Sequence, residues 1–119
     1  MKLSQTSLSL LENTIKKAVS RYNCACDQAI VTDIHLQMTP NIGELSIYND
    51  DDEVLANTTI EEWGTYDGND FNKDIERILS GLLNDMKNAG DFDKMTILRP
   101  FSFVLVDEDK ETLAELLLI

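Results

Sequence analysis

The sequence predicts one α+β domain over residues 1–119, in which two helices pack on one face of an antiparallel sheet of about five strands. The length of 119 residues suits a single domain, and a hydrophobic content of 43% is enough for a core. Two segments repeat apolar residues at helical spacing, and three short segments between them alternate apolar and polar residues. The expected order of elements is therefore α-β-β-β-α-β-β.

The first expected helix covers residues 8–22. Either Ser4 or Ser7 can cap its start, because a short side-chain oxygen accepts a hydrogen bond from the unpaired N–H groups of the first turn. The apolar stripe that would face the sheet consists of Leu8, Leu11, Ile15, Ala18, Val19 and Tyr22.

Three strands are expected next, at residues 29–39, 44–49 and 54–60, because side chains alternate between the two faces of a strand. Turn-forming residues separate these segments at 40–43 and 50–52. Tight turns between successive strands predict an antiparallel meander.

The clearest helical pattern in the chain follows a loop expected at residues 64–70. Asp70 can cap this second helix, and Gly90 fits the position just after its end. The apolar stripe of the helix consists of Phe71, Ile75, Ile78, Leu79, Leu82, Leu83 and Met86.

Residues 94–106 are rich in strand-forming side chains and predict a long strand, in which Pro100 marks an edge or a bulge. The last segment is ambiguous, because Thr112 and Glu115 fit a capping box at the start of a helix. Residues 107–110, however, are typical of a hairpin turn, and so short a helix would be marginally stable. We therefore favour a closing strand.

The formal net charge is −12. This balance argues against binding to nucleic acids and to anionic membranes, because both need clustered Lys and Arg. Most of the charge lies at residues 44–76, which contain eleven acidic residues and a single basic one, Lys73, for a net charge of −10. We expect this block to form an acidic surface.

Aromatic residues lie within the acidic block, and the combination of aromatic anchors with acidic side chains is typical of a surface that binds a basic protein. The candidate partner-binding residues are Tyr48, Asp50, Asp51, Asp52, Glu61, Glu62, Trp63, Tyr66 and Asp67. The alternative is that Trp63 and Phe71 belong to the core, and that the acidic residues form a solvated rim.

No metal and no cofactor are expected. The acidic runs at residues 50–53 and 67–70 lack the alternate spacing of an EF-hand calcium loop. Cys24, Cys26 and the only histidine, His35, could supply three metal ligands, but their spacing does not show that they converge.

A small thiol enzyme is one alternative function. Such an enzyme would use Cys24 or Cys26 as the nucleophile and His35 as the base. Asp33 would lie on the same strand face as His35, two residues away, where it could orient the imidazole ring.

The leading hypothesis is a small acidic protein-binding module that neutralises or regulates a basic protein partner. In composition alone, the chain is similar to immunity proteins, which neutralise toxins. A reducing, cytoplasmic location is expected, because two cysteines do not make a disulfide framework and no signal-like or membrane-spanning run occurs. The remaining alternative is an oligomeric structural domain that pairs with a second copy through its C-terminal strand.

Overall fold

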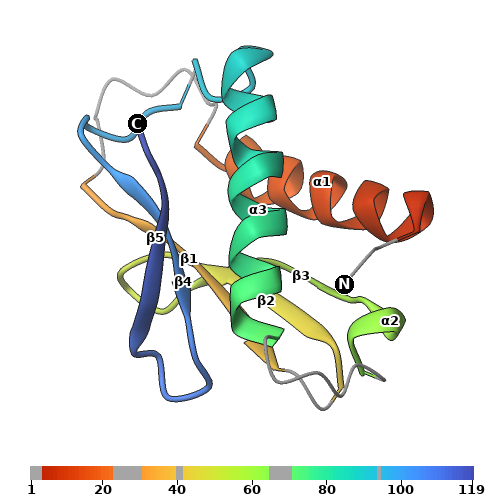
Figure 1. Ribbon diagram of the computed structural model, residues 1–119. Helices are drawn as coiled ribbons and strands as arrows, with labels where there is room; N and C mark the ends of the chain where they lie inside the picture. Colours follow the sequence, from red (N-terminus) through yellow and green to blue (C-terminus); the bar gives the residue numbers. More distant parts are fainter. Residues whose placement is uncertain (1–3, 23–30, 40–41, 65–70, 94) are drawn as a thin grey trace.

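The computed structural model describes residues 4–22, 31–39, 42–64, 71–93 and 95–119, and gives no description of the side chains of residues 64, 71 and 72. The expected order of two long helices and five strands is confirmed, with one additional short helix (Figure 1). The elements are α1 (Gln5–Ser20), β1 (Ile34–Thr39), β2 (Glu44–Tyr48), β3 (Val54–Thr59), α2 (Glu61–Gly64), α3 (Phe71–Asn88), β4 (Ser102–Val106) and β5 (Thr112–Leu118).

The five strands form one sheet in the order β3-β2-β1-β4-β5. The first three strands make the expected antiparallel meander, and β4 pairs with β5 in the same manner. β1 and β4 are parallel, with Ile34 opposite Phe103, because the chain crosses through α3 before it enters β4. The sheet is therefore mixed rather than wholly antiparallel.

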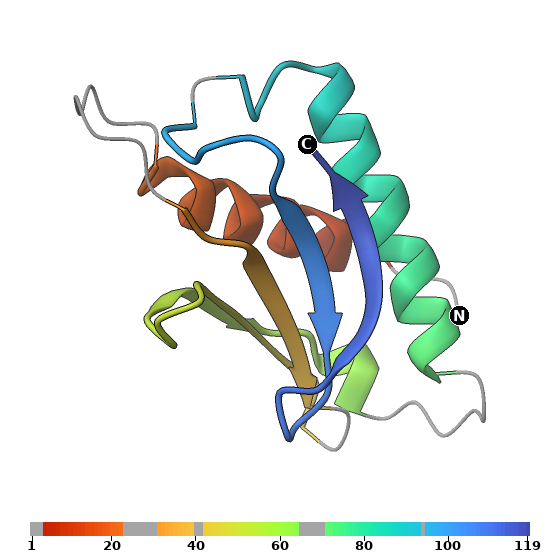
Figure 2. The same ribbon diagram turned by 90° about the vertical axis from the view of Figure 1, so that its left-hand side faces the viewer.

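Both long helices lie on the same side of the sheet (Figures 1 and 2). Their buried side chains share one core cluster with alternate residues of the strands, because successive side chains of a strand point to opposite faces. The strand residues in this cluster include Ile34, Leu36, Met38, Leu45, Ile47, Phe103 and Leu105.

The opposite side of the sheet carries no helix among the described elements, and we call it the helix-free face (Figure 2). The face is formed by His35, Gln37, Ser46, Tyr48, Val104 and Val106, which alternate with the core residues and pair across β2, β1 and β4. Tyr48, Val104 and Val106 make a small buried cluster of their own. This side of the sheet therefore has apolar side chains at its centre.

Two of the helix ends follow the expected capping chemistry. The Ser4 hydroxyl accepts a hydrogen bond from the Ser7 N–H at 3.2 Å, which satisfies a first-turn donor of α1. Gly90 has a φ of +83° after α3, and the N–H groups of Gly90 and Asp91 donate to Lys87 and Met86. These two hydrogen bonds form a Schellman motif, in which the left-handed residue that follows the helix is usually glycine.

The bounds of some elements also differ from the sequence prediction. The strand expected at residues 29–39 begins only at Ile34, and the described residues 31–33 before it are not part of a strand. The long strand expected at residues 94–106 begins only at Ser102, because Pro100 has no N–H to donate and the chain bends at residues 99–100. The four residues of α2 are too few to give a helical repeat, so the sequence pattern did not reveal them. The closing strand is confirmed as β5.

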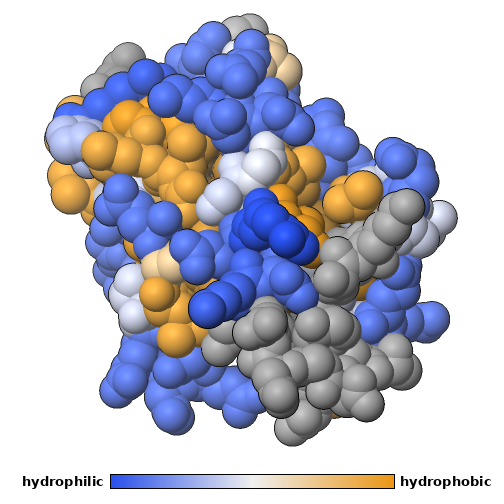
Figure 3. Space-filling view, viewed as in Figure 1, coloured by the Kyte–Doolittle hydropathy of each residue, from blue (hydrophilic) through white to orange (hydrophobic). Residues whose placement is uncertain are grey.

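Apolar side chains are also exposed at one end of the sheet. Figure 3 shows a broad hydrophobic area over the C-terminal end of β5 and the segment that precedes β4. Leu98 is 52% exposed and Leu118 is 53% exposed in these segments. None of the described helices is long and apolar enough to cross a membrane.

Candidate binding surface

Two turns beside the helix-free face have the same backbone geometry. The first turn covers residues 49–53, between β2 and β3, and the second covers residues 107–111, between β4 and β5. In each turn the first N–H donates to the carbonyl of the fifth residue, at 3.2 Å in the first turn and 3.0 Å in the second. In each, the fourth N–H donates back to the first carbonyl. We call the two segments the acidic turns.

Side chains at the first position fix both acidic turns. The Asn49 Oδ1 atom accepts hydrogen bonds from the third and fifth N–H groups of its turn, at 2.9 and 3.1 Å. The Asp107 Oδ1 atom does the same in the second turn, at 2.9 Å for both bonds. In addition, Gln37 on the helix-free face donates to the carbonyls of Asp107 and Glu108, at 3.0 and 3.2 Å. The second turn is therefore held against this face.

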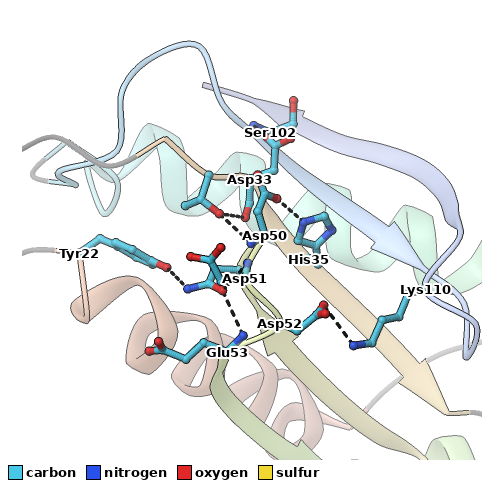
Figure 4. Close-up of polar contacts among 11 residues, drawn as sticks. Tyr22, Asp33, His35, Asp50, Asp51, Asp52, Glu53, Ser102 and Lys110 are labelled. Atoms are coloured by element: carbon cyan, nitrogen blue, oxygen red, sulfur yellow. Dashed lines mark hydrogen bonds and ion pairs between the residues drawn. The ribbon is translucent and has the colours of Figure 1, made fainter.

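The fourth residue of each turn has a left-handed backbone, with a φ of 61° at Asp52 and 66° at Lys110. Glycine or asparagine is the usual residue at such a position. The side chains of these two residues meet instead in an ion pair, with 3.1 Å between Lys110 Nζ and Asp52 Oδ1 (Figure 4). The ion pair joins the two turns across the helix-free face.

Tyr48 lies beneath this ion pair and is only 5% exposed. Its ring stacks on His35, with 5.3 Å between the centroids, and Lys110 Nζ lies 5.0 Å from the centroid of the same ring. The Tyr48 hydroxyl is buried and has no hydrogen-bond partner in the part of the chain that the structure describes. Burial raises the pKa of Tyr48, and the carboxylates of Asp52 and Asp107 raise it further.

His35 pairs with a residue of the first acidic turn. Its Nε2 atom lies 2.6 Å from Asp50 Oδ1, and the Asp50 N–H donates to Thr32 Oγ1 at 2.9 Å (Figure 4). Asp33, which the sequence suggested as the partner of the ring, instead accepts a hydrogen bond from the Ser102 N–H at 2.9 Å. That expectation is corrected. β1 pairs with β4 next to this point, and the Asp33 side chain binds the N–H of Ser102, the first residue of β4.

The acidic turns give this side of the molecule a high density of negative charge. Their acidic residues are Asp50, Asp51, Asp52, Glu53, Asp107, Glu108, Asp109 and Glu111, and all except the half-buried Asp107 are exposed. The cations paired with them in the described chain are Lys110 and Arg21, which lies 2.6 Å from Glu53. Acidic side chains therefore greatly outnumber basic ones at this surface.

The sequence prediction missed half of this surface, because the second acidic turn lies outside the acidic block at residues 44–76. A local signal was present in the chain. Both turns begin with a residue whose side-chain oxygen can accept hydrogen bonds, Asn49 or Asp107, and both end in a glutamate four residues later. The pairing of β1 with β4 then brings the turns to the same face, and no local pattern predicts that pairing.

The acidic residues of α2 lie elsewhere. β3 separates α2 from the first acidic turn by six residues, or about 20 Å of strand, and Figure 1 shows α2 at the other end of β2 and β3. Glu62 accepts hydrogen bonds from the hydroxyls of Ser4 and Ser7 at the start of α1. These hydrogen bonds lower the pKa of Glu62. The Glu62 carboxylate therefore stabilises the N-terminal end of α1.

Trp63 is fully buried, with 0% of its side chain exposed, and belongs to the core cluster. The expectation that Trp63 contacts a partner is therefore corrected, because no partner can reach it in the folded chain. Of the other predicted contact residues, Tyr48, Asp50, Asp51 and Asp52 come together, and Glu61 and Glu62 lie apart from them. Tyr66 and Asp67 lie outside the described residues.

A cavity of about 260 Å³ adjoins the second acidic turn. Its apolar lining comes from β1, α3, β4 and β5, and its acidic lining comes from the turn itself. The described lining residues are Met38, Ile75, Leu105, Val106, Asp107, Glu108, Asp109 and Leu113. The volume lies below the range of about 300–1,000 Å³ that is usual for small-molecule sites, so the cavity suits a single side chain better than a cofactor.

The other proposed chemistries involve residues that the structure describes only in part. Cys24 and Cys26 lie outside the described residues, so neither the thiol enzyme nor the metal site with His35 is tested. Among the described residues, no group of three His, Cys, Asp or Glu side chains is placed to hold a metal ion. The acidic run at residues 67–70 also lies outside the description.

Comparison with known proteins gives no relative: no family model, curated protein or solved structure matches this chain.

Proposed function

We propose that this protein binds a basic protein partner through the helix-free face and the two acidic turns. One observation carries the proposal: two turns more than fifty residues apart in the chain, built in the same way, place eight acidic residues around one uncovered sheet face. Negative charge of this density attracts a cationic surface, raises the rate of encounter and orients the partner.

The internal ion pairs leave most of this charge available to a partner. Arg21 neutralises Glu53, and Lys110 neutralises Asp52. Within the described chain, no Lys or Arg lies within ion-pair distance of Asp51, Glu108 or Asp109. These three carboxylates, exposed and without a basic partner, are the groups that a cationic protein would approach first.

A binding measurement with two matched variants tests the proposal. The probe is a fluorescent peptide of alternating lysine and serine, followed by fluorescence anisotropy at low and physiological salt. The surface variant combines Asp51→Asn, Glu108→Gln and Asp109→Asn. The control combines Glu61→Gln, Glu76→Gln and Asp85→Asn, three exposed acidic residues on α2 and α3. Both variants lose the same formal charge.

The surface variant should bind the peptide at least about tenfold more weakly, and the control about twofold more weakly, because local charge pairs add to the general attraction. Salt should weaken binding to the unmodified protein. An equal loss in both variants would show that only net charge matters, and would overturn the proposal.

Self-association through β5 is a second candidate function. β5 is an edge strand, and it exposes Leu113 to 43% and Leu118 to 53% of their surface. The hydrophobic area in Figure 3 lies over the end of this strand. An exposed apolar edge strand can pair with a second chain. Sedimentation equilibrium should then show a dimer that Leu118→Lys disrupts, and a monomer at all concentrations would exclude it.

A further inference from the structure

The helix-free face already holds an ammonium group, that of Lys110. The Nζ atom of this residue lies 3.1 Å from Asp52 Oδ1 and 5.0 Å from the centroid of the Tyr48 ring. An aromatic ring face beside a carboxylate is the arrangement that recognises alkylammonium ions, because both groups attract positive charge. Yet the Lys110 side chain is 50% exposed, so it lies on this surface and is not enclosed by it.

Backbone conformation makes lysine an unexpected residue at this position. Both Lys110 and Asp52 have positive φ angles, a conformation that disfavours residues with a Cβ atom. Glycine at either position would form the same turn with less strain. Glycine could not make the contact that the two side chains share above Tyr48.

Tyr48 supplies a second, independent observation. Its hydroxyl is buried on a side chain that is only 5% exposed, and among the described residues it has no hydrogen-bond partner. A buried polar group without a partner is costly and is uncommon in folded proteins. The negative charges that act on this hydroxyl belong to Asp52 and Asp107, one from each acidic turn. Both acidic turns therefore contribute negative charge that acts on this hydroxyl.

We propose that Tyr48 and Asp52 form a binding site for the ammonium group of a lysine side chain of the basic partner, and that Lys110 occupies this site in the free protein. The partner's lysine displaces Lys110, takes over the contact with the Tyr48 ring and Asp52, and donates to the Tyr48 hydroxyl. This inference rests on the proposed function, for which it names one specific contact.

Removing the internal cation is the first test. Lys110→Asn keeps a residue that tolerates the left-handed backbone and takes away the competing ammonium. The control is Lys87→Gln, which removes an equal charge from an exposed position in the last turn of α3. The lysine–serine peptide should bind Lys110→Asn about threefold more tightly than it binds Lys87→Gln, since a cation no longer has to be displaced. Equal affinities would overturn the proposed competition.

Removing the carboxylate is the second test. Asp52→Asn preserves the side-chain shape and the left-handed backbone, whereas Asp51→Asn changes the neighbouring exposed residue by the same charge. The peptide should bind Asp52→Asn about three- to fivefold more weakly than Asp51→Asn. In addition, the Tyr48 ring resonances should shift when the unmodified protein binds the peptide, and not when the peptide carries norleucine in place of lysine.

The outcomes separate this inference from the proposed function. If the peptide binds and the surface variant abolishes binding, but Asp52→Asn and Asp51→Asn behave alike, the lysine site is wrong and the acidic surface stands. If the peptide does not bind the unmodified protein, both proposals fail. A peptide with arginine in place of lysine that binds as well and shifts Tyr48 equally would overturn the assignment to lysine.

Discussion

Two acidic regions of this protein come from one stretch of sequence and have different roles. At α2, the Glu62 carboxylate is held by Ser4 and Ser7 at the start of α1, and the adjacent Trp63 lies in the core. At the first acidic turn, Asp51 and Asp52 are exposed, and Asp52 reaches across the sheet to Lys110. The α2 region stabilises the fold, whereas the acidic side chains of the turn are exposed at the surface.

The difference between the regions is set by their neighbours, not by their composition. Both mix acidic and aromatic side chains, which is the composition of a binding surface. At α2, the N-terminus of α1 lies close enough for its serine hydroxyls to donate hydrogen bonds to the Glu62 carboxylate. The partial positive charge at this helix end also favours an acidic neighbour. At the turn, the sheet face beside it carries no helix in the described chain. If this division holds, substitutions at α2 should change stability, and substitutions at the turn should change binding.

Trp63→Ala should have the largest effect on stability. The side chain is fully buried in the core, so its truncation should lower the free energy of unfolding by about 3–5 kcal/mol. Urea unfolding followed by circular dichroism measures the change. The fraction that remains folded should bind the lysine–serine peptide as tightly as the unmodified protein does. Unchanged stability would mean that α2 is not part of the core.

Ser4→Ala should have a smaller effect, because it removes the cap of α1. A lost N-cap costs about 1 kcal/mol, and Ser4 also donates to Glu62. Ser9→Ala is the control, since Ser9 is exposed within the same helix and alanine favours a helix. Thermal unfolding of the two variants should differ in sign: Ser4→Ala melts earlier, and Ser9→Ala melts at the same temperature or later. An earlier melting of both would contradict the capping role.

The pH dependence of stability should reveal Glu62. Its folded pKa lies below the ordinary value, so its contribution is fully present above the unfolded pKa and is lost as the pH falls through the folded pKa. Denaturant unfolding across the acidic range should therefore show a shallower loss of stability in Glu62→Gln than in the unmodified protein. If Glu62→Gln loses stability in parallel with the unmodified protein, the Glu62 carboxylate does not contribute in this way.

Neutralising the acidic turns should have the smallest effect on stability. The variant with Asp51→Asn, Glu108→Gln and Asp109→Asn changes exposed carboxylates that make no side-chain hydrogen bond or ion pair within the described structure. Its free energy of unfolding should stay within about 0.5 kcal/mol of the unmodified value, with any change toward greater stability because like charges repel. Destabilisation by several times that amount would show that these three carboxylates stabilise the fold.

Much of the fold could be predicted from local pattern. The apolar stripes of α1 and α3, the meander, the Gly90 end and the closing strand all follow from periodicity or turn chemistry. The parallel pairing of β1 with β4 could not be predicted in this way, because it depends on where the crossover through α3 returns the chain. The late start of β4 was missed because strand-forming composition continues through the bend before Ser102.

The candidate site was only half predictable for the same reason. Asp50, Asp51 and Asp52 are recognisable as an exposed turn, since acidic residues in a run are common in turns. The contacts that define the surface join distant residues: Asp52 with Lys110, and Glu62 with Ser4. These contacts follow from tertiary structure, so no reading of the acidic block alone could separate the two regions.

NMR can show whether both acidic turns bind the same peptide. The amide resonances of the ¹⁵N-labelled protein should be followed by NMR as the lysine–serine peptide is added at physiological salt. The resonances of residues 49–53 and 107–111 should shift together with one dissociation constant, and those of α2 and α3 should remain unchanged. Shifts centred on α2 or α3, or in only one of the two turns, would contradict the claim that both turns form one binding surface.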